Sequence, residues 1–339
     1  MPVSRAGVVR AIQCRLYNTG PGLRPVPTLP NAELQTFRQH AVGANTPALL
    51  PRGTFNRVPA VSKWFRKPTK RFPQLALNLA YLSNYGATVV PLEITNNGMF
   101  MRIENSFSFF LESVNAQAST FRTTQPGSRY PTAHGPEPHA PARSSLPTDF
   151  FSASASATRP PVTITVPTAR VYLAQAELAD LPRGLRDDVP TPALVLGVGK
   201  GDVYSSSVWL GLAPTYTPLH RDPNPNLFVQ LGGTKRIRLF SPAAGRNVFA
   251  KVQEKIGANA SANLRGEEMM EGAEREALEE EVWGRDDLYR NSAYEAELSG
   301  GDGMFIPKGW WHSVKGTGRG MTGSVSSPYM SLIFELFAD

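Results

Sequence analysis

Short apolar stretches separated by glycine- and proline-containing turns dominate the C-terminal half of the chain. From Val208 onward they follow one another as "VWLGLA", "NLFVQL", "KRIRLF", "GMFIP", "HSVKG" and "SLIFELF". Many short strands at close spacing are typical of an all-β sandwich or barrel. The pattern therefore predicts a mainly β fold for this half of the chain.

The N-terminal half mixes helix and strand patterns. Residues 31–42 and the stretch "SFSFFLESV" have a helical pattern, with Phe109, Phe110 and Val114 as expected core residues of the second. The stretch "ATVVPLEI" has the pattern of a strand. We therefore expect a mainly β protein with flanking helices and an N-terminal α/β extension.

Composition divides the chain into four parts. Residues 1–30 are a basic leader and linker, and residues 31–120 are the helix-and-strand part. Residues 121–168 are rich in proline, serine and threonine, which is typical of a disordered surface insertion. Residues 169–339 are the β core, which an acidic segment with a helical pattern interrupts at about 248–298.

The overall composition excludes several classes of protein. The chain has 339 residues, 41% of them hydrophobic, which is enough to bury a substantial core. Cys14 is the only cysteine, so the chain can form no internal disulfide and no thiolate zinc cage. No apolar run approaches the length of a bilayer span, so we expect a soluble protein with no membrane partner.

Charge is unevenly spread along the chain. Residues 267–287 hold ten acidic residues against Arg275 and Arg285, a net charge of −8, while the whole chain carries +7 and the remainder therefore +15. A basic remainder favours a nucleic acid or an acidic protein as partner, and the alternative is a solvated surface with a basic leader. The acidic segment itself is interpreted as a solvated helical flap, or as a helix that docks a partner.

The first residues have the composition of a targeting segment. Arg5, Arg10 and Arg15 occur before the first acidic residue, Glu33, among small and apolar residues. This composition is typical of a mitochondrial transit peptide, and the alternative is a disordered basic tail on a cytoplasmic or nuclear protein.

One histidine and one aspartate share a face of an apolar segment. In "TPLHRDPNPNLFVQL", His220 and Asp222 are two residues apart, so on a strand both project to the same side. An unpaired carboxylate is unfavourable inside a barrel, and a divalent cation offsets that cost. His312, after a turn with Pro307 and Gly309, supplies a third ligand. Two histidines and one carboxylate with open positions are diagnostic of non-haem Fe(II) oxygenases. The alternative is a chance match between structural histidines.

A lysine changes the balance between these two interpretations. "NLFVQL" and "KRIRLF" are joined by a Gly-Gly turn, a favoured hairpin signal. Lys235 then shares a face with Ile237 and Leu239, and a lysine on an apolar inward face needs an anion. A metal-bound dicarboxylate would place its far carboxylate there. The alternative register turns Arg236 inward and Lys235 toward solvent.

The stretches "VWLGLAPTYTPLHRDPNPNLFVQLGGTKRIRLFSP" and "GDGMFIPKGWWHSV" closely resemble the Jumonji-C, cupin-like Fe(II)/2-oxoglutarate hydroxylases, with the small protein-hydroxylase branch nearest. The resemblance extends upstream to "VYLAQAELADLPRGLRDDVPTP" and covers roughly residues 45–339 apart from the two insertions. It implies a double-stranded β-helix, or cupin jelly roll, as the core of the fold. The chemistry that it implies is a dioxygenase reaction with Fe(II), 2-oxoglutarate and O2.

The resemblance also implies roles for individual residues. It makes His220, Asp222 and His312 the catalytic iron ligands and Lys235 the partner of the distal carboxylate of 2-oxoglutarate. Four further positions match polar cosubstrate-binding positions of the family: Tyr172, Thr217, Asn226 and Ser326. Strand alternation places Thr217, three residues from His220, on the opposite face unless Pro218 bends the chain.

The resemblance leaves the substrate open. We expect hydroxylation of a protein side chain, with oxidation of a modified tRNA nucleoside and a non-catalytic cupin scaffold, binding a partner through its acidic helix, as alternatives. Ser326 stands where many members have asparagine, and Pro328 replaces an aromatic residue. The sequence gives no indication of the oligomeric state or of a hydroxylase rather than a demethylase outcome.

Overall fold

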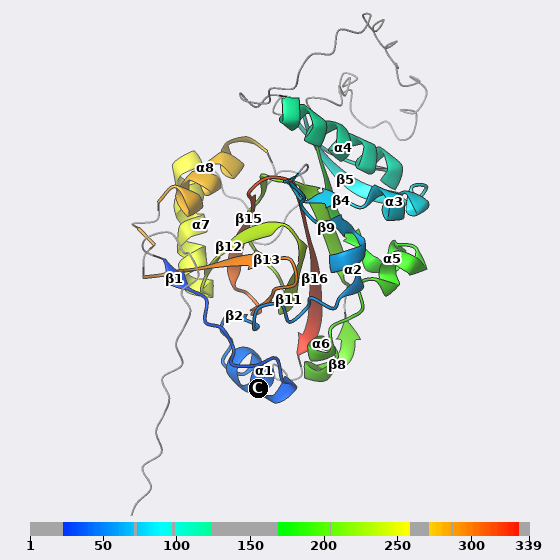
Figure 1. Ribbon diagram of the computed structural model, residues 1–339. Coiled ribbons are helices and arrows are strands. Elements are labelled where there is room, and N and C mark those ends of the chain that lie inside the picture. The colour runs from blue at the N-terminus through cyan, green and yellow to red at the C-terminus, as the bar shows by residue number, and fades with distance from the viewer. Residues whose placement is uncertain are drawn as a thin grey trace, which may run out of the picture.

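Two β-sheets face each other in the core of the molecule, with helices around them (Figure 1). The computed structural model describes residues 23–70, 73–96, 99–123, 169–203, 205–257, 271–285, 288–289 and 291–331. The N-terminal leader up to residue 22, most of the proline- and serine-rich insertion and all but the first residue of the "SLIFELF" stretch lie outside these residues. No helix in the described ranges is long and apolar enough to cross a bilayer.

The smaller sheet has the strand order β1-β13-β12-β15-β10. Its strands are β1 (Arg24–Pro25), β13 (Ala293–Ser299), β12 (Thr234–Phe240), β15 (Trp311–Thr317) and β10 (Thr215–Arg221). All pairings except the short parallel pair of β1 with β13 are antiparallel. Strands that follow one another in this sheet are far apart in sequence, as the crossing connections of a jelly roll require.

The larger sheet has the order β2-β14-β11-β16-β9-β7-β5-β6, with β8 paired to β16. Its strands are β2 (Ala48–Leu49), β14 (Gly303–Ile306), β11 (Asn226–Gly232), β16 (Met321–Ser331), β9 (Ser207–Leu212), β7 (Arg170–Glu177), β5 (Val89–Asn96), β6 (Met99–Ser106) and β8 (Gly199–Val203). A separate hairpin pairs β3 (Phe65–Arg66) with β4 (Ala76–Leu77).

Helices flank the sheets and do not enter the barrel (Figure 1). They are α1 (Leu34–Phe37), η1 (Arg38–Val42), α2 (Pro59–Lys63), α3 (Leu79–Leu82), η2 (Ser83–Tyr85), α4 (Phe107–Thr123), η4 (Leu178–Asp180), α5 (Arg183–Asp187), α6 (Ala193–Val198), α7 (Pro242–Ile256) and α8 (Gly272–Trp283). The predicted fold class, a jelly-roll core with flanking helices, is confirmed. In α4, Phe110 and Val114 are buried as expected, while Phe109 is only partly buried.

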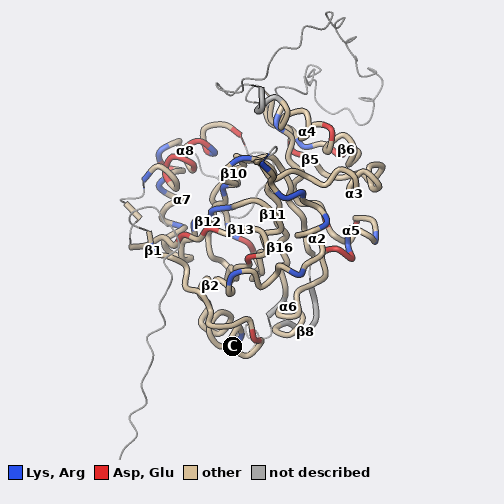
Figure 2. The backbone as a smooth tube through the Cα atoms, viewed as in Figure 1, with Lys and Arg blue, Asp and Glu red and all other residues tan. Residues whose placement is uncertain are grey.

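The acidic segment forms two helices that pack on the smaller sheet. Leu278 and Val282 of α8 are buried, and Lys251 and Lys255 of α7 form ion pairs with acidic residues of α8 at 2.6 and 2.7 Å. Figure 2 shows the acidic residues of α8 close to basic residues of α7. The expectation of a solvated flap is therefore wrong for one face of α8, because successive turns of that helix carry aliphatic side chains that pack on the sheet. The last part of the expected helical segment is strand β13.

Candidate metal centre

Strands β10 and β15 bring two histidines face to face. His220 lies near the end of β10 and is paired in register with His312 at the start of β15. Their ring centroids are 4.2 Å apart. Cross-strand partners project to the same side of a sheet, so both imidazoles point into the barrel. This juxtaposition depends on the jelly-roll connections, since the two residues are far apart in sequence.

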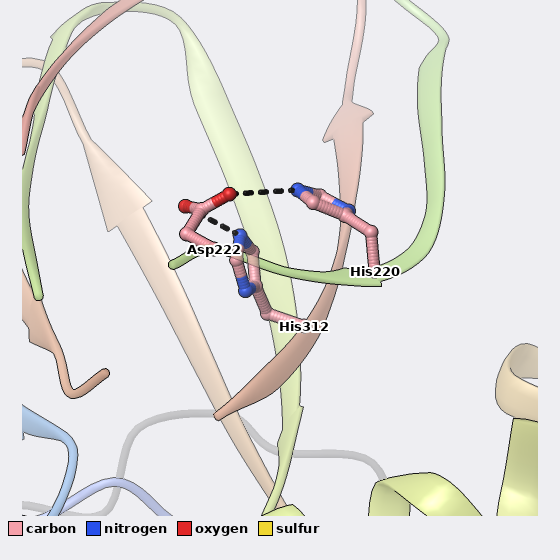
Figure 3. Close-up of side chains that lie close together, drawn as sticks. All are labelled: His220, Asp222 and His312. Carbon is pink, nitrogen blue, oxygen red and sulfur yellow. Dashed lines mark ion pairs between the residues drawn. The ribbon is translucent and has the colours of Figure 1, made fainter. Parts of the chain in front are cut away.

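Asp222 completes the cluster from just beyond the end of β10 (Figure 3). Its Oδ1 lies 3.8 Å from Nε2 of His220, and its Oδ2 lies 3.7 Å from Nε2 of His312. The three donor atoms are within 4.8 Å of one another, so one ion could contact all three. The backbone carbonyl of Asp222 accepts a hydrogen bond of 3.4 Å from the N–H of Gly309, which fixes the strand end beside the turn before His312.

Backbone carbonyls fix the tautomer of both imidazoles. Nδ1 of His220 lies 2.8 Å from the carbonyl oxygen of Pro218, and Nδ1 of His312 lies 3.3 Å from that of Trp310. A carbonyl can only accept, so each Nδ1 carries the proton and each Nε2 is left with its lone pair. The lone pairs are on the nitrogens that face Asp222, which is the arrangement of metal-ligating histidines and their outer hydrogen bonds.

The environment keeps His312 uncharged. Burial and the neighbouring His220 lower the pKa of His312 to about 4, against a smaller opposing effect of Asp222. The imidazole is therefore neutral near pH 7, the form that binds a metal. Asp222 keeps a side-chain exposure of 24%, whereas the side chains of His220 and His312 are 10% and 5% exposed. The centre is thus open to solvent on the carboxylate side.

A β-bulge in β10 decides where Thr217 points. Thr217 is paired with Val314 and His220 with His312, so two residues of β10, Pro218 and Leu219, lie opposite the single residue Ser313 of β15. The extra residue, at Pro218 and Leu219, returns Thr217 to the face of His220. Simple alternation predicts the opposite face, and that prediction is wrong because it takes no account of the bulge.

Lys235 is a buried cation on the same face of the smaller sheet. It is 3% exposed, and Ile237 and Leu239 beside it are fully buried, as the sequence predicts for an inward face. Leu239 is paired with His312, so Lys235 and the metal cluster share one side of the sheet. Burial lowers the pKa of Lys235 to about 7. Within the described ranges, no carboxylate forms an ion pair with its Nζ.

Two hydroxyls contact the ammonium group of Lys235. Nζ donates to Oγ of Ser324 at 2.7 Å and to the hydroxyl of Tyr172 at 3.4 Å, and it lies 5.6 Å from the ring centroid of Phe228. The contact with Tyr172 joins two residues that the sequence resemblance had assigned to one site. Ser324 and Phe228 were missed, and the only signal for Ser324 was its alternation with Ser326 in "GSVSSP".

Asn226 and Ser326 lie on the opposite wall of the barrel. Ser326 is paired with Phe228 in the larger sheet, and Asn226 is two residues from Phe228 on the same strand, so all three share a face. Asn226 is 4% exposed, and its Oδ1 accepts a hydrogen bond of 3.0 Å from the N–H of Ser327. The residues assigned from sequence therefore border one interior, with the histidines at one end and Lys235 toward the other.

The sequence also matches a known protein family. A sequence model of the family described as "Cupin-like domain" matches residues 34–330. The match extends through both sheets and includes each strand that carries the metal cluster and Lys235.

Several curated proteins are similar over part of this chain. "JmjC domain-containing protein D" of Dictyostelium discoideum is 32% identical over 155 residues, which is 42% of this chain and 32% of that protein. "Lysine-specific demethylase JMJ30" of Arabidopsis thaliana is 32% identical over 44% of this chain and 32% of its own length. "Lysine-specific demethylase 8" of Danio rerio is 29% identical over 42% and 32%, respectively. The matched region thus spans about a third of each relative.

Proposed function

This chain belongs to the cupin-like, Jumonji-C domain family, and on that premise we propose that it is a 2-oxoglutarate-dependent dioxygenase that hydroxylates a protein side chain. Fe(II) and 2-oxoglutarate are the metal and cosubstrate of the family. One observation carries the proposal: two buried histidines and a carboxylate share a sheet face with a buried lysine. That ligand set with open positions is the pattern of non-haem Fe(II) oxygenases.

The donor set fits a ferrous ion. His220, Asp222 and His312 would hold it with two neutral nitrogens and one anionic oxygen, because both Nδ1 atoms are engaged by carbonyls. Asp222 would supply the negative charge and remain partly solvated on the side where a substrate arrives. The two carbonyls, from Pro218 and Trp310, would keep the rings oriented when the ligands exchange.

Lys235 fits the far carboxylate of the cosubstrate. Lys235 is four positions along the strand from Leu239, the partner of His312, which is about 13 Å. A five-carbon diacid and a lysine side chain together can bridge such a span. The hydroxyls of Tyr172 and Ser324 would hold the ammonium group and share the carboxylate. Thr217, Asn226 and Ser326 would add polar contacts along the interior.

When bound, Fe(II) with 2-oxoglutarate supplies the oxidation of a substrate C–H bond by O2, with succinate and CO2 as coproducts. The chain contributes orientation and exclusion of water. Ile237 and Leu239 form an apolar wall between Lys235 and His312, and Phe228 closes the opposite side. An apolar interior with one cation strengthens the attraction for a dianion relative to water.

The relatives favour a protein as substrate. Two of them are named lysine-specific demethylases, which act on a modified protein side chain. Hydroxylation of an N-methyl carbon leads to its loss as formaldehyde, so demethylation begins with the same C–H oxidation. Demethylation of a methylated lysine is therefore a second candidate outcome of this site.

An anaerobic titration tests the proposal. Purified protein is mixed with Fe(II) and then 2-oxoglutarate, and a metal-to-ligand charge-transfer band is recorded in the visible region. We expect the band in the natural protein and its loss in His220→Ala. In air, peptide substrates are then screened by mass spectrometry for a gain of one oxygen or loss of a methyl group. Absence of the band in the natural protein would refute the enzyme and favour a scaffold.

A further inference from the structure

A helix on the outer surface contacts the strands that carry the metal ligands. α8 lies over the face of the smaller sheet that points away from the barrel interior, beside β10 and β15 (Figure 1). Its last residue, Trp283, donates through Nε1 to Oγ of Ser313 at 2.9 Å. Ser313 follows His312 directly and is fully buried. The indole therefore bonds to the strand one residue away from a metal-ligating imidazole.

The hydrogen bond continues across the sheet with a fixed direction. Oγ of Ser313 lies 2.8 Å from the backbone carbonyl of Thr217 on β10. An indole N–H can only donate and a carbonyl can only accept, so the hydroxyl accepts from Trp283 and donates to Thr217. Trp283 thus orients the hydroxyl proton toward β10, and hydrogen bonds in such a chain strengthen one another.

The chain of hydrogen bonds ends at the β-bulge that places His220. Thr217 is the last regularly paired residue before the bulge, and the next carbonyl, that of Pro218, accepts from Nδ1 of His220. Anchoring the Thr217 carbonyl fixes the peptide plane from which the bulge departs. The orientation of His220 then depends on a contact made from outside the barrel.

Two charged side chains lie close to the indole ring of Trp283. The guanidinium of Arg238 lies 4.5 Å from its ring centroid and Nζ of Lys315 lies 5.0 Å from it. Lys315 also bonds to Glu279 of α8 at 2.7 Å. These contacts stabilise one position of the indole on the sheet, since cations prefer the face of an aromatic ring.

We propose that Trp283 is a positioning residue for the metal centre, acting through Ser313 on the Thr217–His220 bulge. The inference rests on the proposed function, because it assigns Trp283 to the geometry of that site. The acidic insertion that carries Trp283 is thereby part of the metal-binding apparatus. Loss of the indole N–H removes the donor that orients the hydroxyl of Ser313, and the bond from this hydroxyl to the Thr217 carbonyl is weakened.

Metal affinity without turnover tests this role. Co(II) is titrated anaerobically into the full chain, and binding is followed by the visible d–d absorption of the ion. Trp283→Phe keeps an aromatic ring beside Arg238 and Lys315 but removes the N–H. We expect about 5- to 10-fold weaker Co(II) binding, at or just below the roughly 10-fold cost of losing a hydrogen bond made directly to a metal ligand, because Trp283 acts on His220 only through Ser313. Tyr289→Phe is the matched control, since it removes a hydroxyl bond to Glu281 within the same insertion and should bind Co(II) normally.

A second variant separates positioning from packing. Ser313→Ala removes the hydroxyl that links Trp283 to Thr217. We expect it to weaken Co(II) binding at least as much as Trp283→Phe does. The double variant Trp283→Phe/Ser313→Ala should show no further loss. Additive losses, or unchanged Co(II) binding in both single variants, would overturn the inference. If natural protein and His220→Ala bind Co(II) alike, the proposed metal site itself fails. Melting temperatures identify any variant that loses the fold. If Trp283→Phe does not fold, Co(II) binding by Ser313→Ala alone tests the inference.

Discussion

Lys235 and His312 project from the same face of one sheet, four register positions apart on neighbouring strands β12 and β15. The cation and the metal cluster are therefore held by a continuous ladder of backbone hydrogen bonds, and their separation is fixed by the fold. A ligand that bridges them needs one end that binds a metal and another that carries negative charge. This relationship makes the roles of the two residues separable by experiment.

Removal of a ligand should abolish metal binding. We expect His220→Ala and Asp222→Ala to lose Fe(II) or Co(II) binding and to give no detectable turnover, because two donors cannot fill the site. Metal content and succinate release are the measurements. His40→Ala is the control, since His40 is exposed on η1. Retention of natural metal content in either ligand variant would contradict the assignment.

Removal of the buried cation should affect the cosubstrate and spare the metal. Lys235→Met keeps the length of the side chain and removes its charge. We expect Co(II) affinity to stay unchanged and the Kd for 2-oxoglutarate to rise about 10- to 100-fold, the effect of losing one hydrogen bond between charged groups. Lys255→Met, which breaks only an exposed ion pair, is the control. Natural 2-oxoglutarate affinity in Lys235→Met would remove the lysine from the binding site.

Binding of 2-oxoglutarate should weaken as pH rises above 7. Lys235 has a pKa of about 7 in the free protein, and a bound carboxylate raises it, so binding takes up a proton above pH 7. We expect the Kd to increase about tenfold per pH unit between pH 7 and 9 and to level off below pH 7. Isothermal titration in buffers of different ionisation enthalpy measures both the affinity and the proton uptake. In Lys235→Met this dependence should disappear.

Close packing of α7 on the sheet should make substitution of Gly245 destabilising. A Cβ at Gly245 would lie 2.1 Å from Cγ of Trp311, which is fully buried next to His312. We expect Gly245→Ala to lower the free energy of unfolding by about 1–3 kcal/mol, as overpacking does. Gly257→Ala is the control, because its Cβ meets no atom within 4 Å and adds only the strain of a φ of +65°. Chemical denaturation of both variants compares the two costs.

The sequence was informative where one local rule decides the geometry. His220 and Asp222 share a side because they are two residues apart near a strand end, and the inward face of Lys235 follows from alternation with Ile237 and Leu239. Both rules apply within a single strand. The fold class was predictable for the same reason, since most strands are short apolar runs between turn residues.

The features that sequence reasoning missed depend on contacts between distant segments. The bulge at Pro218 is defined by pairing with β15, and Ser324 contacts Lys235 from the opposite sheet. Trp283 reaches Ser313 only because α8 packs on the outer face of β15. Strand β13 was not predicted as a strand for another reason, because Glu295 and Glu297 make its sequence polar. Glu295 is nevertheless buried, and it is paired there with Arg236 and Arg238.

Strand β1 limits how far the N-terminus of the chain can be shortened. Arg24 and Pro25 pair with β13, Leu23 and Val26 are buried, and the N–H of Leu29 bonds to Leu49 at 2.8 Å. A shortened chain that keeps this sheet intact must therefore begin no later than Leu23. A truncation beyond Leu29 would strip an edge strand from the sheet that carries both histidines, so the N-terminal segment and the histidine cluster depend on one sheet.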